Sequence, residues 1–184
     1  VPGAFMSMLG ISFLNEIINQ KQITEPNEIL EATRTKVKHA LSQKQENTEQ
    51  KDGMDMSVCV FDNTKNELTF AGANNGIFIV RNNELKEYKP TKNPVGSHLK
   101  EIPFEKTTIK IQTGDLIYMY SDGYIDQFGG VDNRKLLRKN FKRIILDNAK
   151  ENLETQQKNI ESAIEIWKGK QPQTDDCTLI GIKI

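Results

Sequence analysis

The sequence contains little of the chemistry that most hydrolases use. Among its 184 residues there are only two cysteines and two histidines. Cys59 and Cys177 lie in apolar runs, which is typical of reduced thiols buried in a protein from a reducing compartment. Neither His39, in a polar helical stretch, nor His98, in a loop, has a neighbouring Ser or Cys turn, which disfavours a Ser-His-Asp hydrolase. No Cys/His spacing fits a zinc site, and no Gly-rich loop of the Walker type is present.

The sequence also lacks an excess of either charge and a long hydrophobic run. Lys+Arg and Asp+Glu both number 25, so the formal net charge is zero, whereas nucleic-acid-binding domains usually carry a basic excess. The longest uncharged run, from Val1 to Asn15, is shorter than the ~20 apolar residues that span a bilayer, and it lacks the positive start of a signal peptide. We therefore expect a cytoplasmic domain that contacts neither nucleic acid nor membrane. This expectation does not exclude a membrane tether elsewhere in the parent chain.

The length fits one domain, which begins with helices. A four-residue spacing of apolar side chains predicts a helix at the start of the chain, through Phe5, Leu9, Phe13 and Ile17. A second helix is predicted over Pro26–Leu41, since proline is favoured in a first turn. The polar stretch Ser42–Lys51 is predicted to be a solvated loop. Because neither Met nor a polar lead-in precedes the first helix, we expect the chain to be cut from a longer protein.

Short apolar runs bounded by turn residues predict strands in the middle of the chain. An antiparallel meander is predicted from four of them: Met56–Phe61, Leu68–Ala73, Ile77–Val80 and Leu85–Tyr88. A hairpin is predicted from Thr107–Ile111 and Leu116–Tyr120, joined by Thr113-Gly114-Asp115. Two helices, through Leu136–Ile145 and Leu153–Trp167, and a last strand at Thr178–Ile184 complete the pattern. This segregation predicts an α+β fold in which helix pairs cover sheets.

Acidic residues at the ends of predicted strands are the best candidates for a functional site. They occur in three clusters: Asp52-Gly53-Met54-Asp55, Ser121-Asp122-Gly123-Tyr124-Ile125-Asp126 and Thr174-Asp175-Asp176-Cys177. Taken alone, each cluster is more typical of a solvated turn than of a functional site. Carboxylates and water, however, are the ligands that hard divalent cations prefer. Because strands of one sheet can bring such ends together, the three clusters predict a shared Mg²⁺ or Mn²⁺ site.

The ordered set of motifs resembles the stage II sporulation protein E-type phosphatases, which are bacterial members of the metal-dependent protein phosphatase 2C superfamily. Pro2-Gly3-Ala4-Phe5-Met6-Ser7 is similar to the stretch that directly follows the family's D-x-x-G-H-G motif. Further matches follow in order along the whole chain: Asp52-Gly53-Met54-Asp55, Ala71-Gly72-Ala73-Asn74-Asn75, Pro94-Val95-Gly96, Gly114-Asp115, Ser121–Gly130 and Asp175-Asp176-Cys177-Thr178. The run Asp122–Gly130 is the most specific of them.

The resemblance implies a protein phosphatase 2C-like αββα sandwich of two antiparallel sheets flanked by helix pairs. It implies a hydrolase that removes phosphate from phosphoserine or phosphothreonine, with two Mn²⁺ or Mg²⁺ ions that acidify an attacking water. Asp122 and Asp175 correspond to catalytic metal ligands of the family, and Asp176 replaces Asp175 if the register slips by one. Asp126 corresponds to a position that helps to hold a third metal, for which Asp52 is the expected partner.

The resemblance also implies that part of the domain lies outside this chain. In the family, an early Asp that bridges both metals, a metal-binding Gly and the first strands precede the position of Val1. We therefore expect residues 1–184 to be inactive as a phosphatase on their own and to bind metal ions weakly. Unpaired strand edges are expected in the blocks Met56–Val80 and Leu116–Tyr120, leading to self-association through an edge or to an edge covered by Val1–Asn15.

The expected partners are a phosphorylated protein, such as an anti-sigma antagonist, and sensor domains upstream in the parent chain. Two other interpretations stay open. A pseudophosphatase would keep the fold in order to bind a regulatory partner, and an unrelated domain would carry acidic turns by chance. An Asp shortly before Val1 in the parent chain would favour the enzyme over the binding module.

Overall fold

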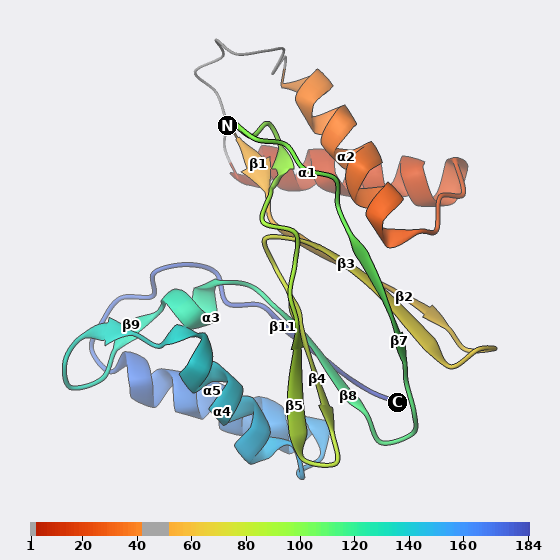
Figure 1. Ribbon diagram of the computed structural model, residues 1–184. Helices are drawn as coiled ribbons and strands as arrows, with labels where there is room; N and C mark the ends of the chain where they lie inside the picture. The colour runs from red at the N-terminus through yellow and green to blue at the C-terminus, as the bar shows by residue number, and fades with distance from the viewer. Residues whose placement is uncertain (1–2, 42–51) are drawn as a thin grey trace. The chain divides into compact units, whose positions relative to one another are not determined.

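The chain alternates between two structural units. The computed structural model describes residues 3–41 and 52–184, so the predicted loop Ser42–Lys51 lies outside the described residues. One unit comprises Val1–Gly76 and Lys89–Ile111, and the other comprises Ile77–Tyr88 and Gln112–Ile184. Each unit combines helices with antiparallel strands, as predicted for an α+β fold (Figure 1).

The helices of the first unit form where predicted, but the predicted apolar spacing of the first is buried only in part: Ile17 is fully buried and Phe13 packs on the core, whereas Phe5 does not. α1 (Gly3–Asn15) continues into a π-helical turn, η1 (Glu16–Gln20), and α2 (Pro26–Ala40) begins with its proline. In α1, Met6 and Gly10 are buried, whereas Phe5 is 49% exposed. The physical reason lies at Gly10, where a Cβ would come within 3.1 Å of the Met54 sulfur, so the helix packs closest on its Gly10 side.

The first unit contains a three-stranded antiparallel sheet with β3 at its centre. The strand order is β2 (Met56–Asp62), β3 (Glu67–Ala73) and β7 (Lys106–Lys110). Leu30 and Val37 of α2 pack in one apolar cluster with Ala71 and Ala73 of β3. Two very short strands, β1 (Gly53–Met54) and β6 (Val95–Gly96), pair antiparallel in the same unit.

The second unit contains a four-stranded antiparallel sheet. Its strand order is β11 (Leu179–Lys183), β8 (Leu116–Tyr120), β4 (Ile77–Arg81) and β5 (Glu84–Tyr88). Phe78 and Val80 of β4 and Tyr118 and Tyr120 of β8 alternate along their strands and form one apolar cluster with the helices. The sheet therefore buries one face against helices, as the layer architecture requires.

Helices of the second unit cover that face of the sheet. α4 (Leu137–Asn148) and α5 (Leu153–Lys168) lie beside it (Figure 1) and contribute Phe141, Ile145, Ile160 and Ile164 to its core. A single turn, α3 (Gly123–Asp126), and two short paired strands, β9 (Phe128–Gly129) and β10 (Arg134–Lys135), connect β8 to α4. Among the described residues, no helix has the length and apolarity needed to cross a membrane.

Two pairings of the predicted meander form, β2 with β3 and β4 with β5. The pairing of β3 with β4 and the hairpin of β7 with β8 are wrong, because these neighbours in the chain belong to different sheets. β3 and β4 flank Asn74-Asn75-Gly76 but do not pair, and neither do β7 and β8. The turn at Gly114 forms as predicted, with a φ of +94° and the Asp115 N–H donating to the Gln112 carbonyl at 3.1 Å. Turn residues therefore mark where the chain bends, but they do not determine which strand comes next to it in a sheet.

Strand edges differ in part from the expectation. In the described residues the outer strands of the two larger sheets are β2 and β7 in one, and β5 and β11 in the other. β8 lies between β4 and β11, so a free edge at Leu116–Tyr120 is wrong, whereas β2 does have one. Self-association through an outer strand stays a prediction.

The cysteines are free thiols, and both are partly rather than fully buried. Burial raises the pKa of Cys59 to about 12. This thiol is therefore protonated at neutral pH and behaves as a small apolar side chain in β2.

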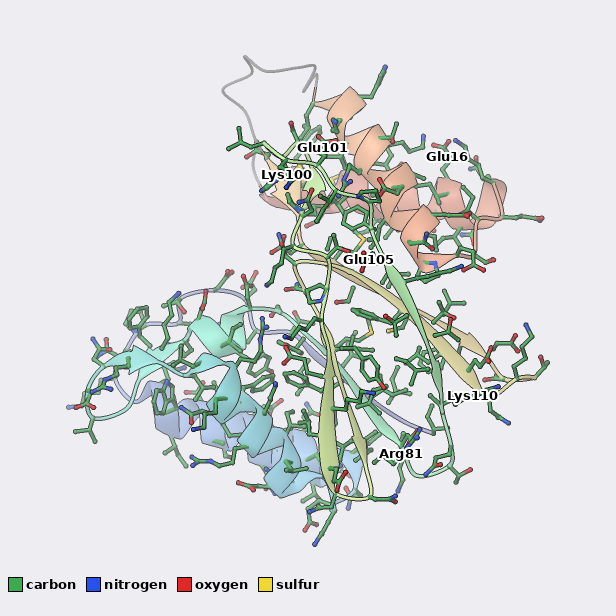
Figure 2. The ribbon with its side chains drawn as sticks, viewed as in Figure 1. Glu16, Arg81, Lys100, Glu101, Glu105 and Lys110 are labelled. Carbon is green, nitrogen blue, oxygen red and sulfur yellow. The ribbon has the colours of Figure 1, made fainter. Side chains whose placement is uncertain are left out.

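A buried carboxylate joins three strands of the second unit at one end of the sheet. The Asp115 carboxylate is fully buried and accepts hydrogen bonds from Nε (2.8 Å) and Nη2 (2.6 Å) of Arg81, labelled in Figure 2, and from the Gln112 N–H (3.0 Å). The Asp115 carbonyl accepts the Ile184 N–H at 3.0 Å, and the Gly114 N–H donates to the Ile184 carbonyl at 2.8 Å. The ends of β4, β8 and β11 are thereby fixed together.

Burial alone would raise the pKa of the Asp115 carboxyl, but the hydrogen bonds from Arg81 and Gln112 outweigh it and hold that pKa below its ordinary value. The carboxylate is thus charged in the folded protein at neutral pH. A charged group in this position must keep its partners, because an unpaired buried charge is strongly destabilising.

We expect Asp115→Asn to lower the free energy of unfolding by about 2–3 kcal/mol, because it replaces a charge-assisted bidentate pair by a weaker amide contact. Arg81 is 38% exposed, so water can partly solvate its guanidinium and limit the loss. Urea unfolding at pH 7 measures the effect. Asp132→Asn, in a pair whose two side chains are 63% and 74% exposed, is the control and should change stability by less than about 0.5 kcal/mol.

The same pair predicts a pH dependence of stability. Because the pKa of Asp115 is lower in the folded state than its unfolded value of about 3.9, its contribution is present above that pH and is lost as the pH falls through the folded-state pKa. Wild-type protein should therefore lose more stability than Asp115→Asn as the pH falls below about 4. Parallel stability curves for the two proteins would contradict this role of Asp115.

Candidate functional site

Asp122 lies where β8 ends and α3 begins. Ser121 follows the last residue of β8, Asp122 is the N-cap of α3, and Asp126 is the last residue of that turn. The Asp122 carbonyl accepts the Asp126 N–H at 2.9 Å. Both carboxylates are half-buried, so the strand-to-helix junction holds two acidic side chains one turn apart.

The segment that carries Asp175 and Asp176 is bonded to the end of β8 through one side chain. The Ser121 hydroxyl donates to the Asp176 carbonyl at 2.8 Å and accepts the Thr178 N–H at 2.9 Å. The Ser121 N–H donates to the Thr178 carbonyl at 3.0 Å. Three hydrogen bonds of Ser121 thus hold the two predicted acidic segments side by side, although they are distant in the sequence.

Gly123 permits this close approach. A Cβ at this position would lie 2.4 Å from the Asp176 carbonyl oxygen and 3.2 Å from the Cys177 sulfur. Contacts of this kind with backbone atoms cannot be relieved by a side-chain rotation, so only glycine fits between α3 and the 176–177 backbone. The Asp-Gly pair therefore has a packing role beyond that of a turn.

A buried glutamine anchors the rest of the loop. The Gln127 side-chain amide is almost completely buried and donates to the carbonyls of Phe128 (2.9 Å) and Pro172 (3.0 Å), while its oxygen accepts the Thr174 N–H at 3.3 Å. Neither Ser121 nor Gln127 is among the predicted site residues. Both lie within the run Ser121–Gly130 that carries the family resemblance, which is the only sequence signal that could have indicated them.

The electrostatics around Cys177 place three carboxylates near one side chain. Burial raises the pKa of this thiol, and the charges of Asp175, Asp176 and Asp122 raise it further, whereas Lys168 opposes them. The thiol is therefore protonated at neutral pH and is a poor nucleophile. The same interactions show that Asp122, Asp175 and Asp176 contribute negative potential to a common place.

The other two predicted ligands have different surroundings. Asp126 Oδ1 pairs with Lys135 Nζ of β10 at 3.1 Å, so a cation of the protein itself already faces this carboxylate. Asp52 belongs to the first unit, directly before β1. There, Gly53 and Met54 pair with Gly96 and Val95.

Asn74 completes the group of motif residues in the first unit. Its side-chain amide donates to Asp55 Oδ1 at 2.8 Å, and its backbone has a φ of +58°, which asparagine tolerates better than most residues. Asn74 is not among the predicted site residues, although it lies in the motif Ala71-Gly72-Ala73-Asn74-Asn75 that resembles the family. Its side chain holds the acidic segment after β1 against the end of β3.

The donor chemistry fits a hard divalent cation in type but is incomplete in number. Asp122, Asp175 and Asp176 offer only oxygen ligands, as Mg²⁺ and Mn²⁺ prefer. However, residues 3–41 and 52–184 contain no group of three or more His, Cys, Asp or Glu side chains placed to hold one metal ion. Asp175 Oδ1 also accepts the Asp176 N–H at 2.7 Å. These carboxylates can therefore supply part of a coordination sphere, with water and other groups supplying the rest.

The recesses on the α5 side of this region are unsuited to phosphate. One, of about 520 Å³, is lined by Glu154 and Glu161 next to Tyr124 and Cys177. A second, of about 350 Å³, shares Glu161 and adds Glu165. Neither is lined by Asp122 or Asp175. The second also contains Lys168, which pairs with Glu165 at 2.6 Å. The glutamates disfavour a phosphate dianion in both recesses.

Comparison with known proteins gives one family and one fold. Residues 1–184 match the family model described as Stage II sporulation protein E (SpoIIE). The SiaA-PP2C domain of Pseudomonas aeruginosa is similar over 100% of this chain and 71% of its own, with 24% identity and a TM-score of 0.89. No curated protein sequence shows a significant match.

Two further solved structures share this mixed fold of helices and antiparallel sheets. The phosphatase domain of the cell fate determinant SpoIIE from Bacillus subtilis, presoaked with Mn, is 17% identical and matches 95% of this chain and 73% of its own, with a TM-score of 0.56. The catalytic domain of the serine threonine protein phosphatase PstP, in complex with two manganese ions, is 17% identical over 97% of this chain and 80% of its own, with a TM-score of 0.61. At these identities the likenesses show that the fold is that of PP2C phosphatase domains.

Gly123→Ala should destabilise the protein by about 1–3 kcal/mol, because its Cβ would press on the Asp176 backbone. The sign of the change in the free energy of unfolding is informative, since a Gly→Ala substitution in an unobstructed helix stabilises a protein by roughly 0.5–1 kcal/mol. Gly181→Ala is the matched control: its Cβ would meet only side-chain atoms at 3.5 Å or more. Urea unfolding of both variants measures the difference, and a stabilised Gly123→Ala protein would show that α3 and the Asp176 segment are not packed together.

Mn²⁺ should bind residues 1–184 weakly, with a Kd no tighter than that of a simple carboxylate pair, because the described residues hold no three-ligand cluster. Isothermal titration with Mn²⁺ tests this, and Asp122→Asn should weaken the binding further, whereas Asp132→Asn should not. A tight two-ion site in these residues would contradict the prediction.

Proposed function

The chain belongs to the stage II sporulation protein E (SpoIIE) family, and on this premise we propose that it acts as a metal-dependent protein serine/threonine phosphatase domain. The observation that supports the proposal most directly is the bonding of Ser121 to the 176–178 segment. It joins the two acidic segments that sequence analysis assigned to one metal centre.

Asp122 and Asp175 are the proposed catalytic ligands, with Asp176 as the substitute for Asp175. Mn²⁺ or Mg²⁺ bound there would supply an acidified water and neutralise charge on the phosphate ester. Asp126 is the proposed additional ligand, and it must give up its ion pair with Lys135 in order to bind a metal. Ser121 and Gly123 position these groups, the first by hydrogen bonds and the second by leaving room for the Asp176 carbonyl.

The side chains around the site favour attack by water over a covalent intermediate. Cys177 is the thiol nearest to the acidic segments, and burial together with the neighbouring carboxylates raises its pKa. A protonated thiol among negative charges does not attack a phosphate dianion. The role left to the protein is to hold and orient carboxylates, which suits hydrolysis of a phosphomonoester in one step.

The proposed substrate is a phosphoserine or phosphothreonine in a regulatory protein of a bacterial signalling pathway, such as an anti-sigma antagonist. A phosphomonoester on a protein surface can reach the strand-to-helix junction, because Asp122 and Asp126 are only half-buried. Sensor domains elsewhere in the protein are the proposed source of regulation.

Asp122→Asn and Asp175→Asn should each lower Mn²⁺-dependent turnover of the full-length protein by at least about 100-fold, because each removes a charged ligand while nearly preserving shape. Release of inorganic phosphate from p-nitrophenyl phosphate and from a phosphoserine peptide measures the loss. Asp132→Asn, an exposed carboxylate outside the site, is the control. Wild-type rates for both variants would exclude the proposed ligands.

The alternative of a binding module without catalysis has one observation in its favour, namely the absence of a three-ligand metal cluster among the described residues. It predicts no Mn²⁺-dependent phosphate release by the full-length protein, together with measurable binding of the phosphopeptide. The same two assays therefore separate the enzyme from the pseudophosphatase.

A further inference from the structure

A run of positive charge follows the candidate site in the second unit. Between Arg134 and Arg143 there are six cationic residues and no acidic one, in a chain whose formal net charge is zero. The run covers β10 and the first two turns of α4. The net charge of the whole chain does not reveal this local excess of positive charge, because acidic residues elsewhere in the sequence balance it.

Four of the six cations have acidic partners within the unit. Arg138 and Lys142 both pair with Glu87 of β5, the former at 3.1 Å. Lys135 pairs with Asp126 at 3.1 Å, and Arg134 pairs with Asp132 at 2.7 Å. Each of these four cations therefore has at least one carboxylate partner in its own unit.

Lys139 and Arg143 are different, because both are exposed and have no ion pair with any other residue that the structure describes. They stand four residues apart in α4 and therefore lie on one side of this helix. Lys135 precedes the helix, at the end of β10 and beside Asp126. The opposite side of the helix carries Phe141 and Ile145, which are buried in the core. We call Lys135, Lys139 and Arg143 the basic stripe.

The basic stripe is held in a fixed position relative to Asp122 and Asp126. The Tyr124 ring of α3 stacks on the Phe141 ring of α4 with 4.8 Å between centroids. Both rings belong to the single core cluster of this unit. A ligand bound along the stripe would therefore be directed towards the strand-to-helix junction, and Lys135 lies where the two meet.

Apolar side chains are exposed next to the stripe. Phe128 of β9 is 38% exposed, Val131 at the β9–β10 turn is fully exposed and Leu137, the first residue of α4, is 57% exposed. A surface that combines cationic with apolar side chains is suited to a folded or extended protein partner, in which apolar contacts give affinity and charges give orientation.

We propose that the basic stripe is a docking surface for an acidic segment of the phosphoprotein substrate, which positions the phosphorylated side chain at the Ser121–Asp126 junction. The inference rests on the proposed phosphatase function and adds a substrate class to it: phosphosites flanked by Asp and Glu. Charge complementarity supports the proposal, because Lys139 and Arg143 form no ion pair within residues 3–41 and 52–184 and a carboxylate-rich segment would supply their counterions.

Other anionic partners fit less well. Nucleic acid requires a larger basic excess than two residues on one helix side and a third in the preceding strand. An anionic membrane requires an amphipathic helix with a free apolar face, whereas the apolar face of α4 is occupied by the core. Asp132 and Asp147 at the two ends of the run also limit it to a short acidic segment.

The test uses full-length protein and two synthetic phosphoserine peptides, one with Asp and Glu around the phosphosite and one with Asn and Gln in their place. We expect Lys139→Glu with Arg143→Glu to lower kcat/KM for the acidic peptide about tenfold relative to kcat/KM for p-nitrophenyl phosphate. For the neutral peptide the same ratio should change less than about twofold. Fluorescence anisotropy should show the matching loss of affinity for the acidic peptide, and that affinity should fall as salt is added.

Lys158→Glu with Lys183→Glu is the control, since it reverses the same number of exposed positive charges elsewhere in the unit. Equal losses for both peptides, an equal effect of the control, or no loss of affinity would overturn the docking surface. So would stripe-dependent sedimentation with phosphatidylserine vesicles while peptide affinity stays constant. If wild-type protein hydrolyses neither p-nitrophenyl phosphate nor peptide, the phosphatase function fails, and the anisotropy measurement still decides on the stripe.

Discussion

The buried Asp115 carboxylate sets the register on which the candidate site depends. It fixes the end of β4 through Arg81, and its backbone and that of Gly114 fix the last residue of the chain. Once Lys183 is opposite Leu116, the ladder places Leu179 opposite Tyr120 at the other end. Ser121 must then meet Thr178, and the acidic residues beside them come together. A one-residue slip of β11 would turn its side chains to the other face and separate the two segments.

Local patterns in the sequence were sufficient for the elements but not for their partners. Strands such as Leu116–Tyr120 and the turn at Gly114 form as predicted, because alternation and turn chemistry act over a few residues. The β2–β3 and β4–β5 pairings form as predicted, whereas the predicted pairings of β3 with β4 and of β7 with β8 are wrong for the opposite reason. Whether β4 pairs with β3 or with β8 depends on burial of residues far apart in the chain, and Ile77 and Phe78 are both fully buried.

The candidate site could be predicted to a similar extent. Strand ends and a family resemblance indicated Asp122 and Asp175, because carboxylates are visible in a sequence as chemical groups. The residues that join the segments of Asp122 and Asp175 could not be predicted from their chemical type in the sequence. Ser121 and Gln127 are uncharged, and only the folded backbone shows that their hydrogen bonds hold the 172–178 loop. The pairing of Asp126 with Lys135 was missed because the lysine comes from a short strand that no periodicity indicates.

The formal net charge of zero did not indicate that positive and negative side chains occupy separate regions of the second unit. Three carboxylates at the β8–α3 junction and the 175–176 segment create negative potential, and the basic stripe begins one ion pair away. A phosphate dianion is repelled by the bare carboxylates and attracted by the stripe. A cation bound among the carboxylates would reverse the first of these effects and leave the second unchanged. The two regions would then act in the same direction on a phosphorylated acidic segment, which explains physically why they should lie next to each other on one core.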